Sequence, residues 1–345
     1  MFRKALFINI FLILFHVLCY SEFPIGIYGV DNPEDIASVK QAGFNCIQTY
    51  KKDVETIRAL AAEAKKYGIK LLVYPYNFIG SKYEKEAESY PLLAWYLYDE
   101  PDVWKMSREA LIALNKKVKN TFRNHKTAFV IGEGATKRKY YDIADILLVD
   151  WYPVPHLPLE SLGKNISYAR QSLDSVGRYK TPVWAVIQMF DWKEYKQYRP
   201  DNKRIGRFPN KNEIRFMSYD AVFNGASGLF YFIYTSNGIP LPKSKPDKWK
   251  DISEIISEIS YASEIFSKGD EIESIIKAEE PLKVKSYIYN GLVYVFILNS
   301  TSNFLKMPEA LLESKVEALY ECECCFKEGR YICPPYHVCV FKYKP

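Results

Sequence analysis

Histidine is scarce in this chain, with four residues in 345. His16 lies in an apolar N-terminal segment, His125 and His337 lie away from the predicted strand ends, and His156 alone is close to one. A metal-dependent hydrolase needs two or three His or Asp ligands that converge on one ion. The sequence therefore disfavours that class, and we predict neither a metal centre nor a cofactor.

Several sequence motifs are also missing. There is no G-x-S-x-G nucleophile elbow, no G-x-x-x-x-G-K-[ST] phosphate loop, and no glycine-rich turn after the first apolar run. The formal charge is +6, and the basic residues are scattered along the chain. This charge is weak for a nucleic-acid binder. We therefore predict no nucleic-acid partner and no Ser-His-Asp hydrolase.

Long apolar runs are confined to the first 21 residues. "MFRK" is a short basic start, "ALFINIFLILFHVL" is an apolar middle, and "CYS" offers small residues before Glu22. The apolar run of about 14 residues is shorter than the roughly 20 that cross a bilayer. We expect a cleaved export signal, no later membrane span, and a secreted or periplasmic protein. An uncleaved anchor and a lipid anchor on Cys19 are the alternatives.

A regular rhythm follows the signal. Short apolar or β-branched runs alternate with helical patterns, such as the spacing of Val54, Ile57, Leu60, Ala61 and Ala64. Continuous apolar strands that alternate with helices indicate a parallel sheet covered on its outside. Eight such units predict a (β/α)8 TIM barrel over residues 22–269, and a doubly wound sheet is the alternative. The eight runs are 23–30, 44–50, 69–76, 92–98, 127–132, 146–152, 181–190 and 227–234.

The last part of the chain has a different pattern. Two alternating strands flank Asn290-Gly291, a strong signal for a two-residue hairpin. We predict a small all-β C-terminal domain over residues 270–345. Five cysteines lie in its last 24 residues, which in an exported protein indicates one or two disulfides. Zinc is the alternative, although "CECC" lacks paired C-x-x-C spacing; the five are Cys322, Cys324, Cys325, Cys333 and Cys339.

The strand ends indicate where the chemistry lies. In a (β/α)8 barrel the active site is formed at the C-terminal ends of the strands. The residues there are aromatic, amide-bearing and acidic, which suits sugars, because aromatic faces pack on C–H groups and acids and amides bind hydroxyls. Cleavage of a glycosidic bond needs two carboxyl groups, and one must keep its proton near neutral pH. We expect the aromatic surroundings Trp95, Tyr98 and Trp104 to favour this at Glu100.

Short segments resemble glycoside hydrolases of the (β/α)8 superfamily, in part the large clan with two catalytic glutamates. That clan places its acid/base Glu at the end of strand 4, commonly after Asn, and "YDEPD" has Glu100 there and Asp99 at the Asn position. "DWYPV" (150–154) resembles the end of strand 6 in bacterial relatives, and 213–234 resembles their helix-7 and strand-8 segment. The C-terminal unit is similar to the β-sandwiches that follow many glycosidase barrels.

The sequence departs from that clan at strand 7, where Gln188 stands at the position of the nucleophilic Glu. A neutral amide forms no glycosyl-enzyme. Three possibilities follow: another strand end supplies the carboxylate (Asp150, then Glu133 or Asp191), the substrate supplies the nucleophile, or the barrel binds sugar without cutting it. A structural protein of the cell envelope is a further alternative, and the oligomeric state stays open.

We therefore predict a glycoside hydrolase acting on O-glycosidic bonds of an oligo- or polysaccharide. Glu100 is the general acid, Asp150 is the partner carboxylate, and Glu133 is a further catalytic candidate. Asp99 at a helix start, with Pro101 following, is a purely structural alternative for that residue. The predicted substrate-binding residues are Asp99, Tyr28, Tyr50, Tyr76, Tyr98, Trp151, Tyr152, Gln188, Trp192 and Tyr231.

Overall fold

The computed structural model describes residues 22–198, 206–274, 276–309, 311, 316–320, 322, 325–327 and 330–345. The predicted export signal (1–21) lies outside these residues. Within the described part of the chain, no helix has the length and apolar character that a membrane span requires.

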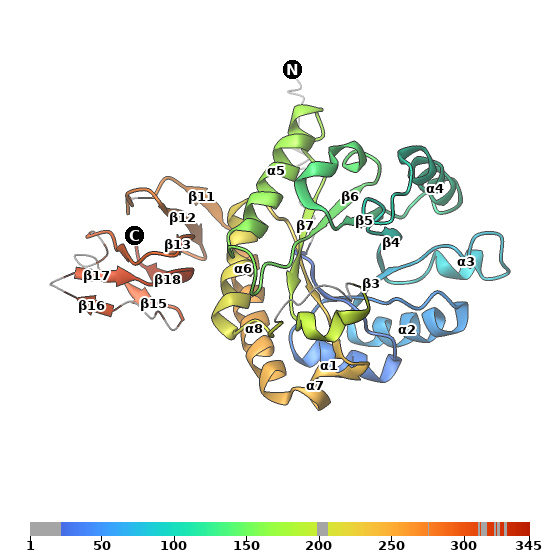
Figure 1. Ribbon diagram of the computed structural model, residues 1–345, viewed down its shortest axis with the longest axis horizontal. Helices are drawn as coiled ribbons and strands as arrows, with labels where there is room; N and C mark the ends of the chain where they lie inside the picture. The colour runs from blue at the N-terminus through green and yellow to red at the C-terminus, as the bar shows by residue number, and fades with distance from the viewer. Residues whose placement is uncertain are drawn as a thin grey trace, which may run out of the picture.

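Eight parallel strands close into a barrel, as predicted from the rhythm of apolar runs (Figure 1). Each strand pairs with its sequence neighbour, and β8 returns to β1 with Gly26 opposite Phe230. The strands are β1 (Ile25–Ile27), β2 (Cys46–Gln48), β3 (Lys70–Val73), β4 (Leu92–Asp99), β5 (Thr127–Ile131), β6 (Ile146–Asp150), β7 (Val183–Gln188) and β8 (Leu229–Phe232).

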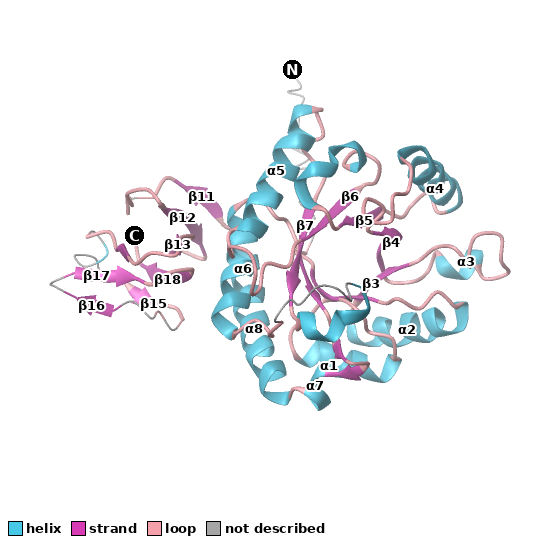
Figure 2. Ribbon diagram, viewed as in Figure 1, coloured by secondary structure: helices cyan, strands magenta, loops and turns pink. Residues whose placement is uncertain are grey.

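Helices surround this barrel (Figure 2). They are α1 (Ile36–Gln41), α2 (Val54–Tyr67), α3 (Glu84–Ala87), α4 (Arg108–Thr121), α5 (Ser161–Ser175), α6 (Lys211–Phe223), α7 (Leu241–Ser244) and α8 (Pro246–Lys268), with the 3-10 turns η1 (Pro33–Asp35), η2 (Gly134–Tyr140) and η3 (Trp192–Tyr198). Helix α2 illustrates how the local sequence determines where a helix begins and ends. Asp53 caps it by accepting from Thr56 N at 2.8 Å, Gly68 ends it at φ 64°, and the predicted apolar face is buried.

Alternation along each strand creates two apolar layers. Residues that point inward fill the barrel, and those that point outward pack under the helices. Gly26 shows how tightly the interior is filled, because a Cβ there would lie 2.2 Å from the ring of Phe230. The interior of the barrel is therefore filled with side chains. Those nearest the C-terminal ends of the strands form the bottom of any site at that end.

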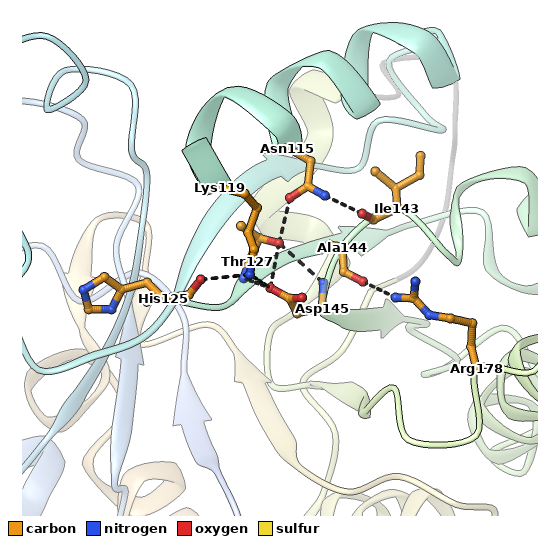
Figure 3. Close-up of polar contacts among 8 residues, drawn as sticks. All are labelled: Asn115, Lys119, His125, Thr127, Ile143, Ala144, Asp145 and Arg178. Carbon is orange, nitrogen blue, oxygen red and sulfur yellow. Dashed lines mark hydrogen bonds and ion pairs between the residues drawn. The ribbon is translucent and has the colours of Figure 1, made fainter. Parts of the chain in front are cut away.

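A polar network holds the lower ends of β5 and β6 to α4 (Figure 3). Asp145 accepts from Lys119 Nζ at 2.8 Å and from Thr127 N at 2.9 Å. Asn115 accepts from Thr127 Oγ1 and donates to Ile143 O. These bonds satisfy backbone groups at the end of the barrel opposite the predicted site. They fix the position of β5 relative to β6, the strands that lead to Glu133 and Asp150.

The C-terminal region forms two antiparallel sheets, as predicted. One has the order β11-β12-β13-β18-β15 and the other β14-β17-β16. Asn290 (φ 50°) and Gly291 (φ 73°) form the predicted turn between β12 and β13. The bounds are β9 (Thr235–Ser236), β10 (Ile239–Pro240), β11 (Asp270–Ile272), β12 (Leu282–Tyr289), β13 (Leu292–Asn299), β14 (Leu305–Lys306), β15 (Glu317–Ala318), β16 (Cys325–Lys327), β17 (Arg330–Cys333) and β18 (His337–Tyr343), where β9 and β10 form a separate pair.

The five-stranded sheet packs against α6 and α8 (Figure 1). Arg215 of α6 binds Glu258 of α8 and donates to Val338 O of β18 at 2.6 Å. A cavity of about 330 Å³ lies at this junction, lined by Asn210, Lys211, Asn212, Arg215, Glu258, Tyr320 and His337. Because its buried cation Arg215 is already paired with Glu258, we do not assign chemistry to this cavity.

A disulfide joins Cys322 to Cys339. It confirms one of the one or two disulfides predicted among the C-terminal cysteines. Cys324 lies outside the described residues, as does the side chain of Cys325, and Cys333 is buried. His337 lies close to the disulfide, with a ring nitrogen within 4.8 Å of both sulfurs. The disulfide already uses these two sulfurs, so the sulfurs do not act as zinc ligands in this state.

Asp220 of α6 makes the stability of the fold depend on pH. Its side chain is 1% exposed, and it packs so closely that a Cβ on Gly163 of α5 would lie 2.1 Å from Asp220 Oδ2. Burial raises the pKa of Asp220 to about 7. Between pH about 4 and about 7 the folded protein thus binds a proton that the unfolded chain has lost, and its stability falls as pH rises through this range.

We expect Asp220→Asn to remove this pH dependence. A shift of one pKa unit corresponds to about 1.4 kcal/mol. At pH 8 the free energy of unfolding of the variant should therefore differ from that of wild type by at most about 4 kcal/mol. Urea unfolding at pH 5 and pH 8 measures it. An unchanged loss of stability between these two pH values in the variant would contradict the assignment.

Candidate active site

Two adjacent carboxylates, Asp99 and Glu100, both face the mouth of the barrel. A regular strand would point them to opposite sides. The pairing of β4 with β5 skips one residue between Tyr96 and Asp99, which is a β-bulge. Glu100 then adopts φ 51°, a left-handed conformation that costs free energy for a residue with a Cβ. The bulge and this strained residue together turn both acids toward the same space.

The carboxyl of Glu100 lies beside that of Asp150, which comes from the end of β6, the strand next but one to β4. Asp150 is 5% exposed, and Tyr152 donates its hydroxyl to Asp150 Oδ2 at 3.3 Å. Among the described residues, no group donates a hydrogen bond to the buried Asp150 Oδ1. Two adjacent carboxylates are costly to bury when both are ionised, so these surroundings favour a state in which one of the two keeps a proton.

The surroundings stabilise that proton. Burial raises the pKa of Glu100 to about 7, and repulsion from Asp99 and Asp102 acts in the same direction. Burial and then repulsion from Glu100 raise the pKa of Asp150 well above its ordinary range. The two groups titrate as a pair.

Gly132 provides the space for Glu100. A Cβ at this position would lie 2.3 Å from Glu100 Oε1, so the carboxyl rests directly on the glycine. Asp102, 4% exposed, accepts from Gly132 N at 3.1 Å and from Glu133 N at 2.7 Å. The loop that carries Glu100 is thus fastened to the end of β5. Gly132 therefore permits the close approach of the Glu100 carboxyl to the backbone.

Asp99 belongs to a second polar group at the mouth. Tyr96 donates its hydroxyl to Asp99 at 2.6 Å, and the hydroxyls of Tyr96 and Tyr28 are 3.4 Å apart. Burial raises the pKa of Asp99, while the Tyr96 hydrogen bond and the charge of Lys52 oppose this. The Lys52 ammonium lies 4.9 Å from the centre of the Tyr74 ring. Asp99 therefore has partners of its own and adds negative charge beside Glu100.

Aromatic rings form the wall beside Asp150. The ring of Tyr152 lies edge-on to that of Phe190, with ring centres 5.0 Å apart, and its centre is 5.6 Å from that of Phe232. The ring centres of Trp192 and Phe190 are 4.9 Å apart. Tyr28 connects this wall to Tyr50, with ring centres 6.2 Å apart. Each of these residues has the inward register of its strand or follows it. Tyr28, Tyr50, Tyr152 and Trp192 are thus gathered with Asp150 around one apolar surface, and Tyr76 stacks on Tyr74 beside Asp99.

Three residues predicted to bind substrate pack against the outer layer in this structure. Trp151 donates to Ser161 of α5 at 2.9 Å, and the Tyr231 hydroxyl is 2.8 Å from that of Ser218 on α6. Tyr98 packs against the outer apolar layer, because the bulge turns Asp99 inward in its place. Trp151 and Tyr231 follow inward residues by one position, so the period of two places them under the helices.

Gln188 has the inward register but is not free to bind a sugar. Its amide oxygen accepts from Val154 N and its amide nitrogen donates to Val154 O, both at 2.8 Å, and the side chain is fully buried. The residue therefore shapes the loop after β6. In this structure both polar atoms of its amide are thus bonded to the backbone of Val154.

The other acidic candidates lie at the edge of the mouth. Glu133 is exposed, yet near enough for its charge to raise the pKa of Glu100. Asp191 accepts from Lys193 N at 2.8 Å within its own turn. Of the surroundings predicted for Glu100, Trp95 packs on Phe122 in the outer layer and Trp104 is 60% exposed. Asp150 is therefore the carboxylate that the barrel brings to Glu100.

Sequence reasoning missed four residues of this site: Tyr96, Asp102, Phe190 and Phe232. Counting inward positions by two from Phe230 and Gln188 would have found Phe232 and Phe190. No sequence pattern indicated Asp102, because its function depends on its contact with the end of β5.

Comparisons with solved structures agree with this architecture. Amy13B of Eubacterium rectale superposes with a TM-score of 0.58 at 9% sequence identity, over 94% of this chain and 96% of that one. An α-amylase from Anoxybacillus superposes with a TM-score of 0.54 at 12% sequence identity, over 94% of this chain and 98% of that one. A GH30 endoxylanase from Clostridium papyrosolvens C71 superposes with a TM-score of 0.51 at 9% sequence identity, over 94% of this chain and 96% of that one. No protein-family model and no curated protein matches the chain.

At these identities the likeness establishes the fold. The chain superposes on these proteins over nearly its whole length, which confirms the (β/α)8 fold that the resemblance of its strand-end segments implies.

We expect Gly132→Ala to destabilise the protein through Glu100 alone. The new methyl group must displace the Glu100 carboxyl, at a cost of about 1–3 kcal/mol. In a Glu100→Ala background the same change should cost close to nothing, because the obstructing carboxyl is gone. Urea unfolding of the four proteins in this cycle measures the coupling. Equal costs in both backgrounds would show that Glu100 does not rest on Gly132.

Proposed function

We propose that this protein hydrolyses O-glycosidic bonds of an oligo- or polysaccharide, with Glu100 as general acid and Asp150 as the partner carboxylate. The observation that carries the proposal is the pair of adjacent carboxyls, Glu100 and Asp150, at the centre of the barrel mouth. We further propose that the chain is exported, on the composition of residues 1–21.

The short contact between the carboxyls bears on stereochemistry. Inverting glycosidases keep their carboxyl groups about 6.5–9.5 Å apart to admit water, and retaining enzymes about 5–5.5 Å apart. Two carboxyls that lie side by side are nearer the second arrangement. We therefore propose retention, with Asp150 as nucleophile and Glu100 as acid, then base.

The shared proton gives this pair a way to reach its working state. In the free protein one carboxyl of the pair keeps a proton. When that proton lies on Glu100, Asp150 is a carboxylate and Glu100 is an acid. Asp150 then bonds to the anomeric carbon while Glu100 passes the proton to the leaving oxygen, and the sugar–oxygen bond breaks. Water attacks the glycosyl-enzyme, and Glu100 takes a proton from it.

The wall of rings supports a sugar as the substrate. Tyr152, Trp192 and Phe232 offer aromatic surface beside Asp150, where the C–H face of the reacting ring would pack. Asp99 and Lys52 on the opposite side offer partners for hydroxyl groups. An amide at position 188 does not exclude catalysis here, since Asp150 occupies the position of partner to Glu100.

We expect Glu100→Gln and Asp150→Asn to differ in how they respond to the leaving group. Glu100→Gln should lose about 10²–10⁴-fold in kcat on a natural glycosidic bond and little on a 2,4-dinitrophenyl glycoside, which departs without a proton. Asp150→Asn should be inactive on both, because both need the nucleophile. Product release from a panel of oligosaccharides and 2,4-dinitrophenyl glycosides of both anomers measures this.

Glu133→Gln is the matched control, since it removes a carboxylate from the edge of the same mouth and should cost less than about tenfold. Binding of a glycan without turnover by wild type and all variants would instead identify a carbohydrate-binding barrel that does not cut. Wild type that neither cuts nor binds any glycan would reject the proposal and favour a structural protein.

The pH dependence of kcat/KM should follow the shared proton. Because the pKa of Glu100 is raised to about 7, activity should fall as pH rises through about 7, when the pair loses its proton. Asp99 raises this pKa by repulsion, so Asp99→Asn should move the alkaline limb to lower pH. A limb that stays in place or moves upward in Asp99→Asn would contradict the electrostatic account.

A further inference from the structure

The loop between β4 and α4 carries an exposed tryptophan close to Glu100. Trp104 is 60% exposed and Val103 is 38% exposed, although both side chains are apolar. Trp104 N donates to Glu100 O at 3.1 Å, so its backbone is one turn from the acid. A large apolar side chain in water gains free energy when a partner covers it.

This loop holds Trp104 in one place. Met106 N donates to Pro101 O at 2.8 Å, and Lys105 N donates to Asp102 O at 3.3 Å. Asp102 fastens the loop to the end of β5, and the hydroxyl of Tyr140 donates to Met106 O. A side chain on a backbone held in this way loses less conformational entropy on binding a ligand than one on a mobile loop.

The chemistry of the acid decides what part of a substrate lies over this loop. Glu100 must contact the glycosidic oxygen, and Asp150 must contact the anomeric carbon. The reacting sugar therefore lies toward β6–β8, over Asp150 and the aromatic wall. The leaving group lies on the side of β4 and its loop, where Trp104 is exposed.

We propose that Trp104 is a stacking surface for a sugar unit of the leaving group, and that the substrate is accordingly a chain of several sugars with units on both sides of the cleaved bond. This inference rests on the proposed function. A sugar fits better here than an anionic lipid surface, because Asp99 and Glu133 place negative charge around Glu100 on the same side of the barrel.

Paired substrates of different length test this inference. The probes are maltohexaose, xylohexaose, cellohexaose and chitohexaose, each with the glycosyl fluoride of its monosaccharide. On the hexasaccharide that wild type cuts, Trp104→Ala should lower kcat/KM about 10-fold, mainly through KM. It should leave the glycosyl fluoride unchanged, because a fluoride leaving group is too small to reach the ring. Trp104→Phe should keep most of the activity, since it retains an aromatic face.

Tyr179→Ala is the matched control. Tyr179 is 71% exposed and lies between α5 and β7, at the end of the barrel opposite the mouth, so its loss should change neither substrate. Cleavage of a hexasaccharide that is unaffected by Trp104→Ala, or an equal loss on both substrates, would overturn the inference and leave the proposed function standing. Wild type that cuts and binds none of the eight probes would reject the proposed function and this inference with it.

Discussion

The site depends on the close contact between the carboxyl groups of Glu100 and Asp150. The two residues come from strands on different sides of β5, and the charges that act most strongly on them are other carboxylates. Two adjacent negative charges in an apolar setting are costly to bury, so the pair favours a state that keeps one proton. In the proposed function that proton lies on Glu100 as the acid, which leaves Asp150 ionised as the nucleophile.

Much of the surrounding structure serves this contact. The bulge in β4 and the left-handed Glu100 bring a second acid to a position that a regular strand would turn away. Gly132 leaves room for the carboxyl, and Asp102 fixes the loop above it. Such departures from regular geometry are expected where function competes with local preference. The regular part of the barrel supplies the rigidity that keeps them in place.

The barrel and the central pair were predictable from the sequence, because strand rhythm and strand ends are local signals. Asp99, Glu100 and Asp150 each follow an apolar run directly, and barrel strands share one direction. The orientation of neighbouring aromatics was predicted less well. A bulge that no residue type announces placed Tyr98 outside, and Trp151 and Tyr231 required strict counting by two. The contacts of Gln188 were not predicted, because its partner, Val154, lies on another loop.

The most direct test is a carbon-13 NMR titration of the side-chain carboxyls, with Glu100→Gln and Asp150→Asn to assign the two resonances. The account predicts that at pH 6 the pair still holds one proton, and that in each single variant the remaining carboxyl titrates at a different pH from wild type. Two carboxyls that ionise independently below pH 5 would show that no proton is shared, and the proposed acid and nucleophile would lose their physical basis.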